Sequence, residues 1–270
     1  MIWFNGQLVD DAASAATSAG MLLGWGVFTT IGVWNARPFA LQQHLARLKH
    51  DAAHCEIEYS IDDATLGNAL REVIKRNQIV RGIARITITK RGDGRWNTAS
   101  GSDVSIVVRP MEDIVTPATI TFSPFHLHSN RALAGVKSTS NLDYQLAWRE
   151  AQSRGFDEAI LLNQNEHICE GARSNLFWTC NGELFTPSRQ TGCLPGIARS
   201  LVLRWAQERD VVTHEVELTL DKFFEAKSVF LTSAATGVRE VCAFDGRNLP
   251  TNNLISHLQD CWRDAANHGD

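Results

Sequence analysis

The sequence has no excess of basic residues. Its 26 lysines and arginines are outnumbered by 30 aspartates and glutamates, which gives a formal net charge of −4. Proteins that bind nucleic acid neutralise phosphates with a positive field. The charge therefore gives no support for nucleic-acid binding.

Long apolar runs are also missing. The longest, such as residues 21–28 (MLLGWGVF), fall well short of the roughly 20 apolar residues that a membrane-spanning helix needs. The first residues, MIWFNGQLVDD, have neither a basic flank nor a small-residue cleavage site, so no signal peptide is evident. We therefore expect a cytoplasmic protein with no membrane partner.

The cysteines do not form a metal-binding pattern. None of the six belongs to a Cys-x-x-Cys pair, whereas structural zinc sites draw their ligands from such close clusters. We expect reduced thiols that serve mainly in packing, and no metal site. The cysteines are Cys55, Cys169, Cys180, Cys193, Cys242 and Cys261.

The composition is that of an ordinary globular protein. Hydrophobic residues make up 44% of the chain and charged residues 21%, which argues against disorder. A chain of 270 residues can form one large domain or two modest ones. Residues 111–119 (MEDIVTPAT) carry no clear period and contain a proline, so we place the joint between two domains there. The predicted domains are 1–113 and 120–270, with a linker at 114–119.

The first half of the chain indicates an α+β unit. Asn5-Gly6 is a hairpin signal, and Asn35 interrupts a stretch rich in β-branched and aromatic residues. Apolar residues then recur at the spacing of an amphipathic helix. The expected elements are a hairpin in 1–11, two strands and a turn in 26–41, helices at 41–55 and 64–76, and strands at 84–90 and 104–110. A glycine-rich polar segment, 91–103, separates the last two strands and is expected to form a loop beside the site.

The second half alternates strands with two strong helix patterns. One helix pattern begins at Leu142 and ends at about Arg154, where Gly155 is a C-cap signal. The other opens at Gly196 and continues to Asp210. Strands are expected at 157–163, 182–187, 212–218 and 228–234, followed by a small-residue loop and final strand at 234–246 and a closing helix at 254–267. The segment 167–181 is expected to be a strand region with a Cys-Glu-Gly turn closed by Ser174 and Asn175.

Lys137 is the first residue whose surroundings suggest chemistry. Its neighbours, AGVKSTSN, are small and nearly uncharged, which suits a lysine that points inward. A lysine that can lose its proton forms a Schiff base with a carbonyl cofactor. The alternative is a solvent-exposed lysine.

Glu170 is the second such residue. It lies between Cys169 and Gly171 in an otherwise apolar strand pattern, an unusual place for a solvated charge. A carboxylate can keep the ring nitrogen of pyridoxal phosphate protonated, which lets the ring accept electrons from a carbanion. The alternative is a carboxylate that caps a turn at the end of a strand.

Three features could together bind a phosphate. Gly196 and Ile197 open a helix whose first N–H groups are free to bind an anion. The small-residue loop 232–237 (TSAATG) offers further N–H and hydroxyl donors, and Arg47 can pair with a phosphate through two hydrogen bonds. Each also has a simpler interpretation, as a helix start, a turn and a surface arginine.

The order and spacing of these features resemble the fold-type IV pyridoxal-phosphate enzymes. That group contains the branched-chain aminotransferases, the D-amino acid aminotransferases and the aminodeoxychorismate lyases. The matching segments span nearly the whole chain: GWGVFTTIGVWNARPFALQQHLARL, KSTSNLDYQLAWREA, GFDEAILLN, ICEGARSNLFW, LFTP, LPGIAR and VFLTSAATGV.

The resemblance implies an α/β (α+β) protein of two domains. The N-terminal domain would be small and α+β, and the larger C-terminal domain would hold pyridoxal 5'-phosphate on a barrel-like sheet. A homodimer with its active site near the interface is also implied. Lys137 would form the Schiff base, Glu170 would contact the ring nitrogen, and Arg47 would bind the phosphate. The phosphate site would be completed by Gly196, Ile197, Ser233, Ala234 and Thr236.

The chain departs from the usual pattern of the group at several positions. Ala198 replaces a threonine, Leu142 replaces a tyrosine of the branched-chain enzymes, and Ala234 replaces one of their hydroxyl residues. Thr29 stands where an acidic residue is usual, and the resulting Phe-Thr-Thr is associated with some lyases of the group. The candidates for substrate binding are Thr29, Arg91, Arg95, Ala235 and Arg239.

We therefore expect a transaminase that moves an amino group between an amino acid, or an amine, and a 2-oxo acid. Two alternatives stay open. The first is an aminodeoxychorismate lyase, which releases pyruvate and gives 4-aminobenzoate through the same residues. The second is a non-catalytic homologue that binds the cofactor, which the altered phosphate site would favour.

Overall fold

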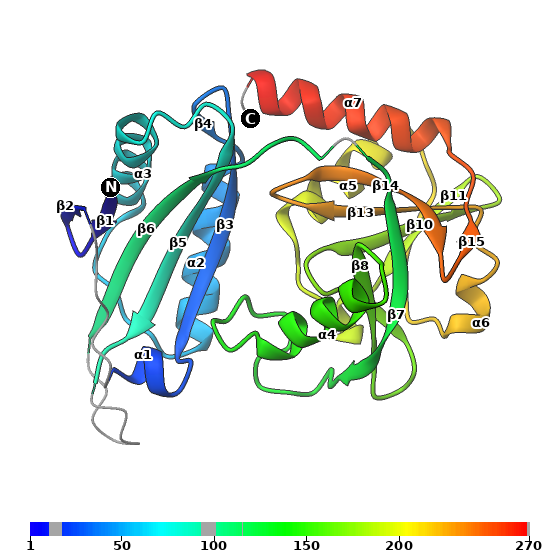
Figure 1. Cartoon of the computed structure of the whole chain (residues 1–270), viewed down its shortest axis with the longest axis horizontal. Coiled ribbons are helices and arrows are strands. Elements are labelled where there is room, and N and C mark those ends of the chain that lie inside the picture. The colour runs from blue at the N-terminus through cyan, green and yellow to red at the C-terminus, as the bar shows by residue number, and fades with distance from the viewer. Residues whose placement is uncertain (11–17, 93–100, 115, 269–270) are drawn as a thin grey trace. The chain divides into compact units, whose positions relative to one another are not determined.

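The computed structural model describes residues 1–10, 18–92, 101–114 and 116–268, and in it the chain forms two compact units (Figure 1). Unit 1 comprises Met1–Glu112, Val136–Ser140 and Ala265–Asp270, and unit 2 comprises Asp113–Gly135 and Asn141–Asp264. Lys137 thus belongs to unit 1, although it is distant in sequence from the rest of that unit. The linear boundary at 114–119 stays a prediction.

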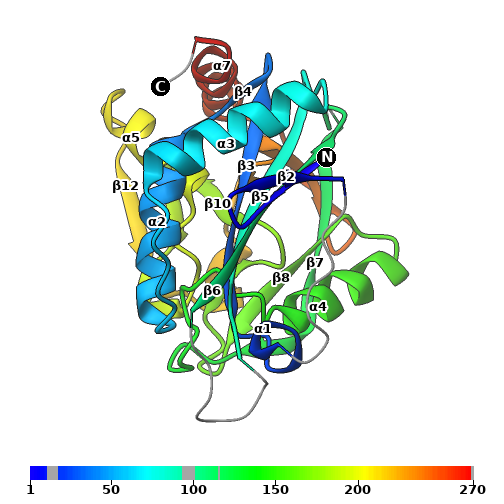
Figure 2. The ribbon, with the colours of Figure 1, turned by 90° about the vertical axis from the view of Figure 1, so that its left-hand side faces the viewer.

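Unit 1 contains an antiparallel sheet of six strands in the order β2-β1-β6-β5-β3-β4. Two long helices pack on this sheet, and a short helix lies at its edge (Figure 2). The strands are β1 (Ile2–Phe4), β2 (Gln7–Val9), β3 (Gly26–Trp34), β4 (Arg37–Pro38), β5 (Gly82–Lys90) and β6 (Ser102–Pro110), and the helices are α1 (Ala19–Leu22), α2 (Leu41–His54) and α3 (Asp63–Arg76).

The two tight turns of unit 1 lie where the sequence predicts them. Asn5 and Gly6 both have positive φ, as the hairpin between β1 and β2 requires. Asn35 and Ala36 also have positive φ, in the turn between β3 and β4. Asp62 caps α3 by accepting a hydrogen bond from the Thr65 N–H, 2.7 Å away. Local sequence signals therefore determine these boundaries.

The core of unit 1 lies between the sheet and the two long helices. Val27, Ile31 and Val33 of β3 are fully buried and pack with the apolar faces of α2 and α3. Because side chains alternate along a strand, Thr29 shares this helix-facing side while Phe28 points to the opposite side. This alternation decides which residues can contact Arg47 and which can contact the Lys137 side chain.

Unit 2 contains a curled sheet of nine strands, seen in green, yellow and orange in Figure 1. Eight strands follow the order β12-β11-β10-β13-β14-β7-β8-β9, and β15 pairs with β14. The strands are β7 (Ala118–Leu127), β8 (Glu158–Asn163), β9 (Ile168–Gly171), β10 (Asn175–Cys180), β11 (Glu183–Pro187), β12 (Thr213–Val216), β13 (Ser228–Ser233), β14 (Gly237–Phe244) and β15 (Arg247–Asn248).

All six residues of β8 are buried because apolar clusters pack on both of its faces. Ile160 packs in one apolar cluster with Phe223 and Phe244, and Leu161 packs in another with residues of α4.

The helices in this half of the chain are α4 (Leu142–Ser153), α5 (Ile197–Gln207), α6 (Leu220–Phe223), α7 (Asn253–His268) and the short 3-10 helix η1 (Arg189–Thr191).

The architecture confirms the predicted mixed α/β class and most of the predicted elements. The region 167–181 forms two strands, β9 and β10, with a turn between them, as predicted. A turn closed by the Gly171 N–H and the Ser174 carbonyl, 2.8 Å apart, separates them. Within the described part of the chain, no helix combines the length and the hydropathy needed to cross a membrane.

Candidate active site

The backbone around Lys137 is fixed by hydrogen bonds within unit 1. Its carbonyl accepts from the Phe28 N–H at 2.9 Å, and its own N–H donates to the Asp51 carboxylate at 3.2 Å. Beside it, the Thr139 N–H donates to the Gly26 carbonyl at 2.8 Å. The segment 136–140 therefore pairs with the start of β3 in antiparallel fashion, although no local pattern links the two.

The Lys137 side chain lies on the face of β3 that is turned away from the helices. Its Nζ is 4.8 Å from the centre of the Phe28 ring. The guanidinium carbon of Arg85 is 3.6 Å from the same centre, so the ring contacts two basic side chains. The lysine is half-buried.

Thr29 connects α2 to β3 through a short chain of hydrogen bonds. Arg47 Nη2 donates to Thr29 Oγ1 at 3.0 Å, and Thr29 Oγ1 lies 2.7 Å from His44 Nδ1. The threonine hydroxyl has two lone pairs and one proton, so it accepts from the arginine and also forms a hydrogen bond with Nδ1 of His44.

Burial keeps this histidine neutral. Its pKa is lowered from 6.5 to about 3, mainly by burial and further by the nearby positive charges of Arg47 and Lys137. His44 Nε2 is buried and has no hydrogen-bond partner among the described residues. The sequence analysis did not single out His44, and only its position on the inner face of the 41–55 helix pattern could have indicated it.

Arg47 has a buried guanidinium group whose Nη2 has a hydrogen-bond partner and whose Nε has none among the described residues. Burial lowers its pKa from the ordinary value, and the charge of Asp51 opposes this effect. Arg47 Nε is buried without a hydrogen-bond partner in the part of the chain that the structure describes. A cation in this state is suited to an anionic ligand.

In unit 2, Glu170 is held by donors from two different elements. Its carboxylate is buried, with 4% of the residue exposed. Tyr144 Oη donates to Oε1 at 2.8 Å, and the Leu194 N–H donates to Oε2 at 2.9 Å. Arg131 Nη2 donates to Tyr144 Oη at 2.6 Å. Glu170 is therefore an oriented acceptor and not a solvated carboxylate.

The N-terminus of α5 is shaped for a close ligand. Gly196 is its N-cap residue, and no side chain caps the helix there. The amide oxygen of Asn175 occupies the place where a Cβ on residue 196 would lie. Asn175 is itself fixed, because its Nδ2 donates to the Leu194 carbonyl at 2.9 Å. The uncapped first turn, with Ile197, can offer its N–H groups to an anion.

The loop 233–236 lies next to this helix start through β10 and β13. Asn175 is paired in register with Thr232, the residue before the loop. Ser233 Oγ is 2.8 Å from Thr236 Oγ1 and accepts from the Thr236 N–H at 3.1 Å, while Ala234 between them is half-buried. Thr232 Oγ1 is buried and has no partner within the described ranges. Glu170, Gly196 and Ser233 are thus brought together within unit 2.

The structure assigns other partners to most of the substrate-binding candidates. Arg91 pairs with Asp103 at 2.6 Å, and Arg239 donates to the Thr116 carbonyl at 3.0 Å and lies 3.4 Å from Asp157. Thr29 is fully buried in the hydrogen bonds described above. Ala235 is half-buried in the loop, and Arg95 lies outside the described residues.

These residues fit pyridoxal phosphate by the chemistry of the donor set. Unit 1 supplies an amine and a buried cation with an unpartnered N–H. Unit 2 supplies an oriented carboxylate, an uncapped helix N-terminus and a buried hydroxyl without a partner. Thr232 belongs to the predicted donor loop 232–237, whereas Asn175 and Tyr144 were not predicted as donors because their partners are distant in the chain.

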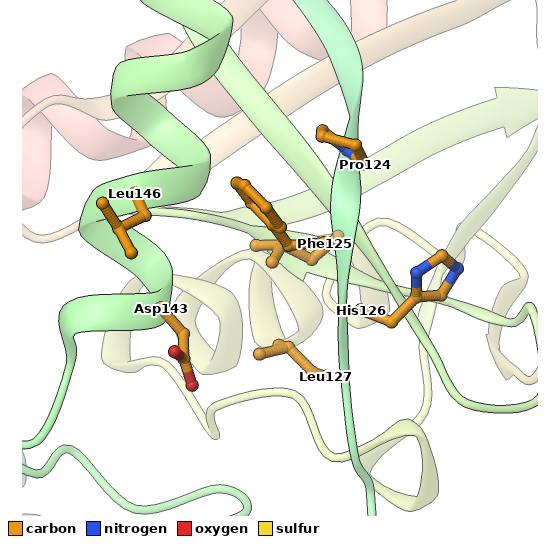
Figure 3. Close-up of a pocket in the computed structure, with 7 residues that line it drawn as sticks. Pro124, Phe125, His126, Leu127, Asp143 and Leu146 are labelled. Atoms are coloured by element: carbon orange, nitrogen blue, oxygen red, sulfur yellow. The ribbon is translucent and has the colours of Figure 1, made fainter.

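A separate cavity of about 370 Å³ lies between β7 and the start of α4 (Figure 3). Most of the residues that line it are apolar, and Asp143 is the acidic one. The His126 side chain points away from Asp143 and Leu146 and lies 3.1 Å from Glu166 (Figure 3). The residues around it are Pro124, Phe125, His126, Leu127, Asp143, Leu146 and Leu161. None of the predicted site residues is among them, so this cavity is distinct from the candidate site.

The profile of the family described as amino-transferase class IV matches residues 26–244. The branched-chain-amino-acid aminotransferase of Escherichia coli K12 is 31% identical over 265 residues, which cover 91% of this chain and 85% of that protein. The crystal structure of the Escherichia coli branched-chain enzyme has a TM-score of 0.92 at 26% identity, covering 98% of this chain and 94% of that one. The structure of 4-amino-4-deoxychorismate lyase from Pseudomonas aeruginosa has a TM-score of 0.87 at 25% identity and covers 98% of both chains.

Proposed function

Since the chain belongs to the class IV aminotransferase family, we propose that it transfers an amino group between an amino acid, or an amine, and a 2-oxo acid with pyridoxal phosphate as cofactor. The observation that carries the proposal is the extent of the match. Residues 26–244 include the amine, the buried cation, the oriented carboxylate and both phosphate-binding elements. An enzyme of this family depends on that cofactor.

In this proposal the cofactor is held at both ends. Lys137 Nζ attaches it covalently, and Arg47 binds its phosphate together with the first turn of α5, at Gly196 and Ile197. Ser233 and Thr236 supply hydroxyl donors, and the backbone of Ala234 supplies an N–H. The buried guanidinium, with its unpartnered Nε, supports the role of Arg47.

When bound, pyridoxal phosphate supplies an electron sink for the pair left behind when a bond at the substrate Cα breaks. The amine of Lys137 would accept the proton from the substrate Cα and donate it at C4′ of the cofactor, which is the proton shift that transamination requires. Glu170 accepts the hydrogen bond of the ring nitrogen and so keeps a proton there. Burial of Glu170 excludes water that would compete for this contact.

Two further properties are proposed on the basis of the family. The protein would act in the cytoplasm on small amino and oxo acids, and it would form a homodimer. Sedimentation equilibrium tests the second point. The expected mass is twice the 29.9 kDa of one chain, and a mass of 29.9 kDa at micromolar concentration would contradict it.

The lyase remains the second candidate, and a specific feature favours it. Thr29 replaces an acidic residue, and its hydroxyl binds Arg47 and His44 in place of a charge. The likeness to the solved lyase extends over 98% of this chain. An enzyme of that kind would use the same amine and carboxylate to release pyruvate.

One assay separates the candidates. The purified protein is offered L-amino acids, D-amino acids and (R)-amines with 2-oxoglutarate, and separately aminodeoxychorismate without an oxo acid. Glutamate formed from any donor supports the transaminase. Pyruvate released without an oxo acid overturns it in favour of the lyase, and cofactor binding without either product overturns it in favour of a non-catalytic homologue.

The substrate-carboxylate partner is tested in the same assay. The candidates Arg91, Arg95 and Arg239 are each replaced by methionine, and Thr29 and Ala235 by valine. A true partner raises KM for the oxo acid and leaves cofactor binding intact. If KM is unchanged in a variant, the residue replaced in that variant is no longer a candidate for binding the substrate carboxylate.

A further inference from the structure

The structure places a second pair of residues behind the Glu170 carboxylate. Tyr144 comes from the first turn of α4, and Arg131 comes from the loop between β7 and α4. Neither residue was predicted to belong to the site. Their hydrogen bonds form one line from Arg131 through Tyr144 to Glu170, at 2.6 and 2.8 Å.

The direction of each hydrogen bond in this line is fixed by chemistry. Arginine can only donate, so Tyr144 Oη accepts from Arg131. The single proton of the tyrosine is then directed at Glu170 Oε1. A hydroxyl that accepts from a cation becomes a stronger donor, because the two bonds polarise each other.

The tyrosine remains a donor over the whole working range of pH. Its pKa is raised well above the ordinary value, first by burial and then by the negative charge of Glu170. Its ring packs in an apolar cluster with Ala147, Cys169 and Cys193, which restricts its movement. The guanidinium carbon of Arg131 lies 5.2 Å from the centre of the same ring.

Glu170 therefore receives one donor from a side chain and one from the backbone. The Leu194 N–H holds Oε2, and Tyr144 holds Oε1. Two donors on opposite oxygens fix the plane of the carboxylate and favour its ionised form. A carboxylate that keeps a ring nitrogen protonated needs both properties.

We propose that Tyr144 and Arg131 are positioning residues that hold Glu170 as an oriented acceptor for the ring nitrogen of pyridoxal phosphate. The proposal rests on the proposed function, since it assumes that Glu170 contacts that nitrogen. Both residues act through Glu170, so their effect is specific to the nitrogen end of the cofactor. The phosphate end is held by other residues and is unaffected.

A pair of ligands isolates this effect. The protein without cofactor is titrated with pyridoxal phosphate and with its 1-deaza analogue, in which a C–H group replaces the ring nitrogen. The wild type should bind pyridoxal phosphate more tightly than the analogue. Tyr144→Phe should weaken the binding of pyridoxal phosphate by about tenfold, as expected for a lost hydrogen bond to a charged group, and change binding of the analogue by less than about twofold.

The chain supplies its own control, because its two tyrosines are Tyr59 and Tyr144. Tyr59→Phe should leave both affinities unchanged. Arg131→Met keeps the Tyr144 hydroxyl but removes the cation behind it, and should reduce the preference for pyridoxal phosphate by a smaller factor. Arg131→Met serves as the test if circular dichroism shows that Tyr144→Phe does not fold.

The outcomes are distinct. An unchanged preference in both variants overturns the positioning role, and so does an equal loss of affinity for the two ligands, which indicates a structural role. A wild type that binds neither ligand contradicts the proposed function itself. A wild type that prefers pyridoxal phosphate, with the preference reduced in both variants, supports the inference.

Discussion

Burial decides the charge of single residues at this site. In unit 1, Arg47 and His44 share one hydroxyl, that of Thr29, yet one is a cation and the other is neutral. The histidine stays neutral because its position is buried and two basic side chains are near. An added proton on His44 would be the third positive charge in this region. Its neutrality leaves the positive charge to the groups that face the ligand.

The first residue-level prediction concerns stability against acid. The pKa of His44 is about 3 in the folded protein and 6.5 when unfolded, so below pH 6.5 the unfolded chain binds a proton that the folded chain does not. Stability from this group is complete above pH 6.5 and falls as the pH drops toward 3, by at most about 1.4 kcal/mol per pH unit. Urea unfolding at pH 7.5 and pH 5 measures the loss.

His44→Gln should reduce this pH dependence, whereas His128→Gln, at an exposed position, should not. The comparison of variants is needed because other groups also titrate in this range. Equal pH dependence in wild type and His44→Gln would contradict the assigned state of His44.

The second residue-level prediction concerns Arg47. Arg47→Lys keeps the charge but loses the planar group that reaches Thr29 and a phosphate together. Affinity for pyridoxal phosphate should fall about tenfold, because a charge-assisted hydrogen bond is lost. Arg71→Lys, at an exposed position of α3, is the matched control and should bind normally. Normal affinity in Arg47→Lys would remove this residue from the phosphate site.

Secondary structure was predictable where the signals are local. Asn5-Gly6 and Asn35 gave the correct turns, and the 3.6-residue period of α2 placed Arg47 beside the core. The turn closed by Gly171 and Ser174 also lies where a local signal, Cys-Glu-Gly, predicted it. Contacts between distant segments were not predictable, since no local pattern pairs Lys137 with Phe28 or Tyr144 with Glu170.

The start of α5 gives a prediction at the level of elements. A Cβ at position 196 would collide with the Asn175 amide, which is held by the Leu194 carbonyl. Gly196→Ala should therefore shift the first turn of α5, reduce stability by about 1–3 kcal/mol and weaken cofactor binding. Thermal unfolding and a cofactor titration measure the two effects.

Gly67→Ala in α3 is the control. Its added Cβ would meet the flexible end of Arg71 at 3.3 Å, in a helix that favours alanine over glycine. Stability should stay within about 1 kcal/mol of the wild type, and affinity for the cofactor should not change. If Gly196→Ala behaves like Gly67→Ala, the close packing at the helix start has no bearing on the phosphate.

At the scale of the whole molecule, the residues proposed to hold the cofactor come from both units. Unit 1 carries Lys137 and Arg47, and unit 2 carries Glu170 and the start of α5. Composition and charge indicated an ordinary globular protein but could not assign residues to units. The grouping of residues 136–140 with unit 1 depends on long-range contacts alone.

Cofactor binding should therefore stabilise the whole chain. A ligand that binds only the folded state adds about 2.7 kcal/mol at a concentration of 100 times Kd. Thermal unfolding should move to higher temperature with pyridoxal phosphate, in a single transition, and less so in Lys137→Ala. If the protein unfolded in two separate transitions and pyridoxal phosphate raised the temperature of only one of them, only one unit would hold the cofactor.

The most direct test of the central claim is to find where the cofactor is attached. The protein is loaded with pyridoxal phosphate, treated with borohydride to make the bond permanent, digested and mapped by mass spectrometry. The account predicts a single modified lysine, Lys137, and no such modification in Lys137→Ala. Stoichiometric modification of another lysine, or of none, would contradict it.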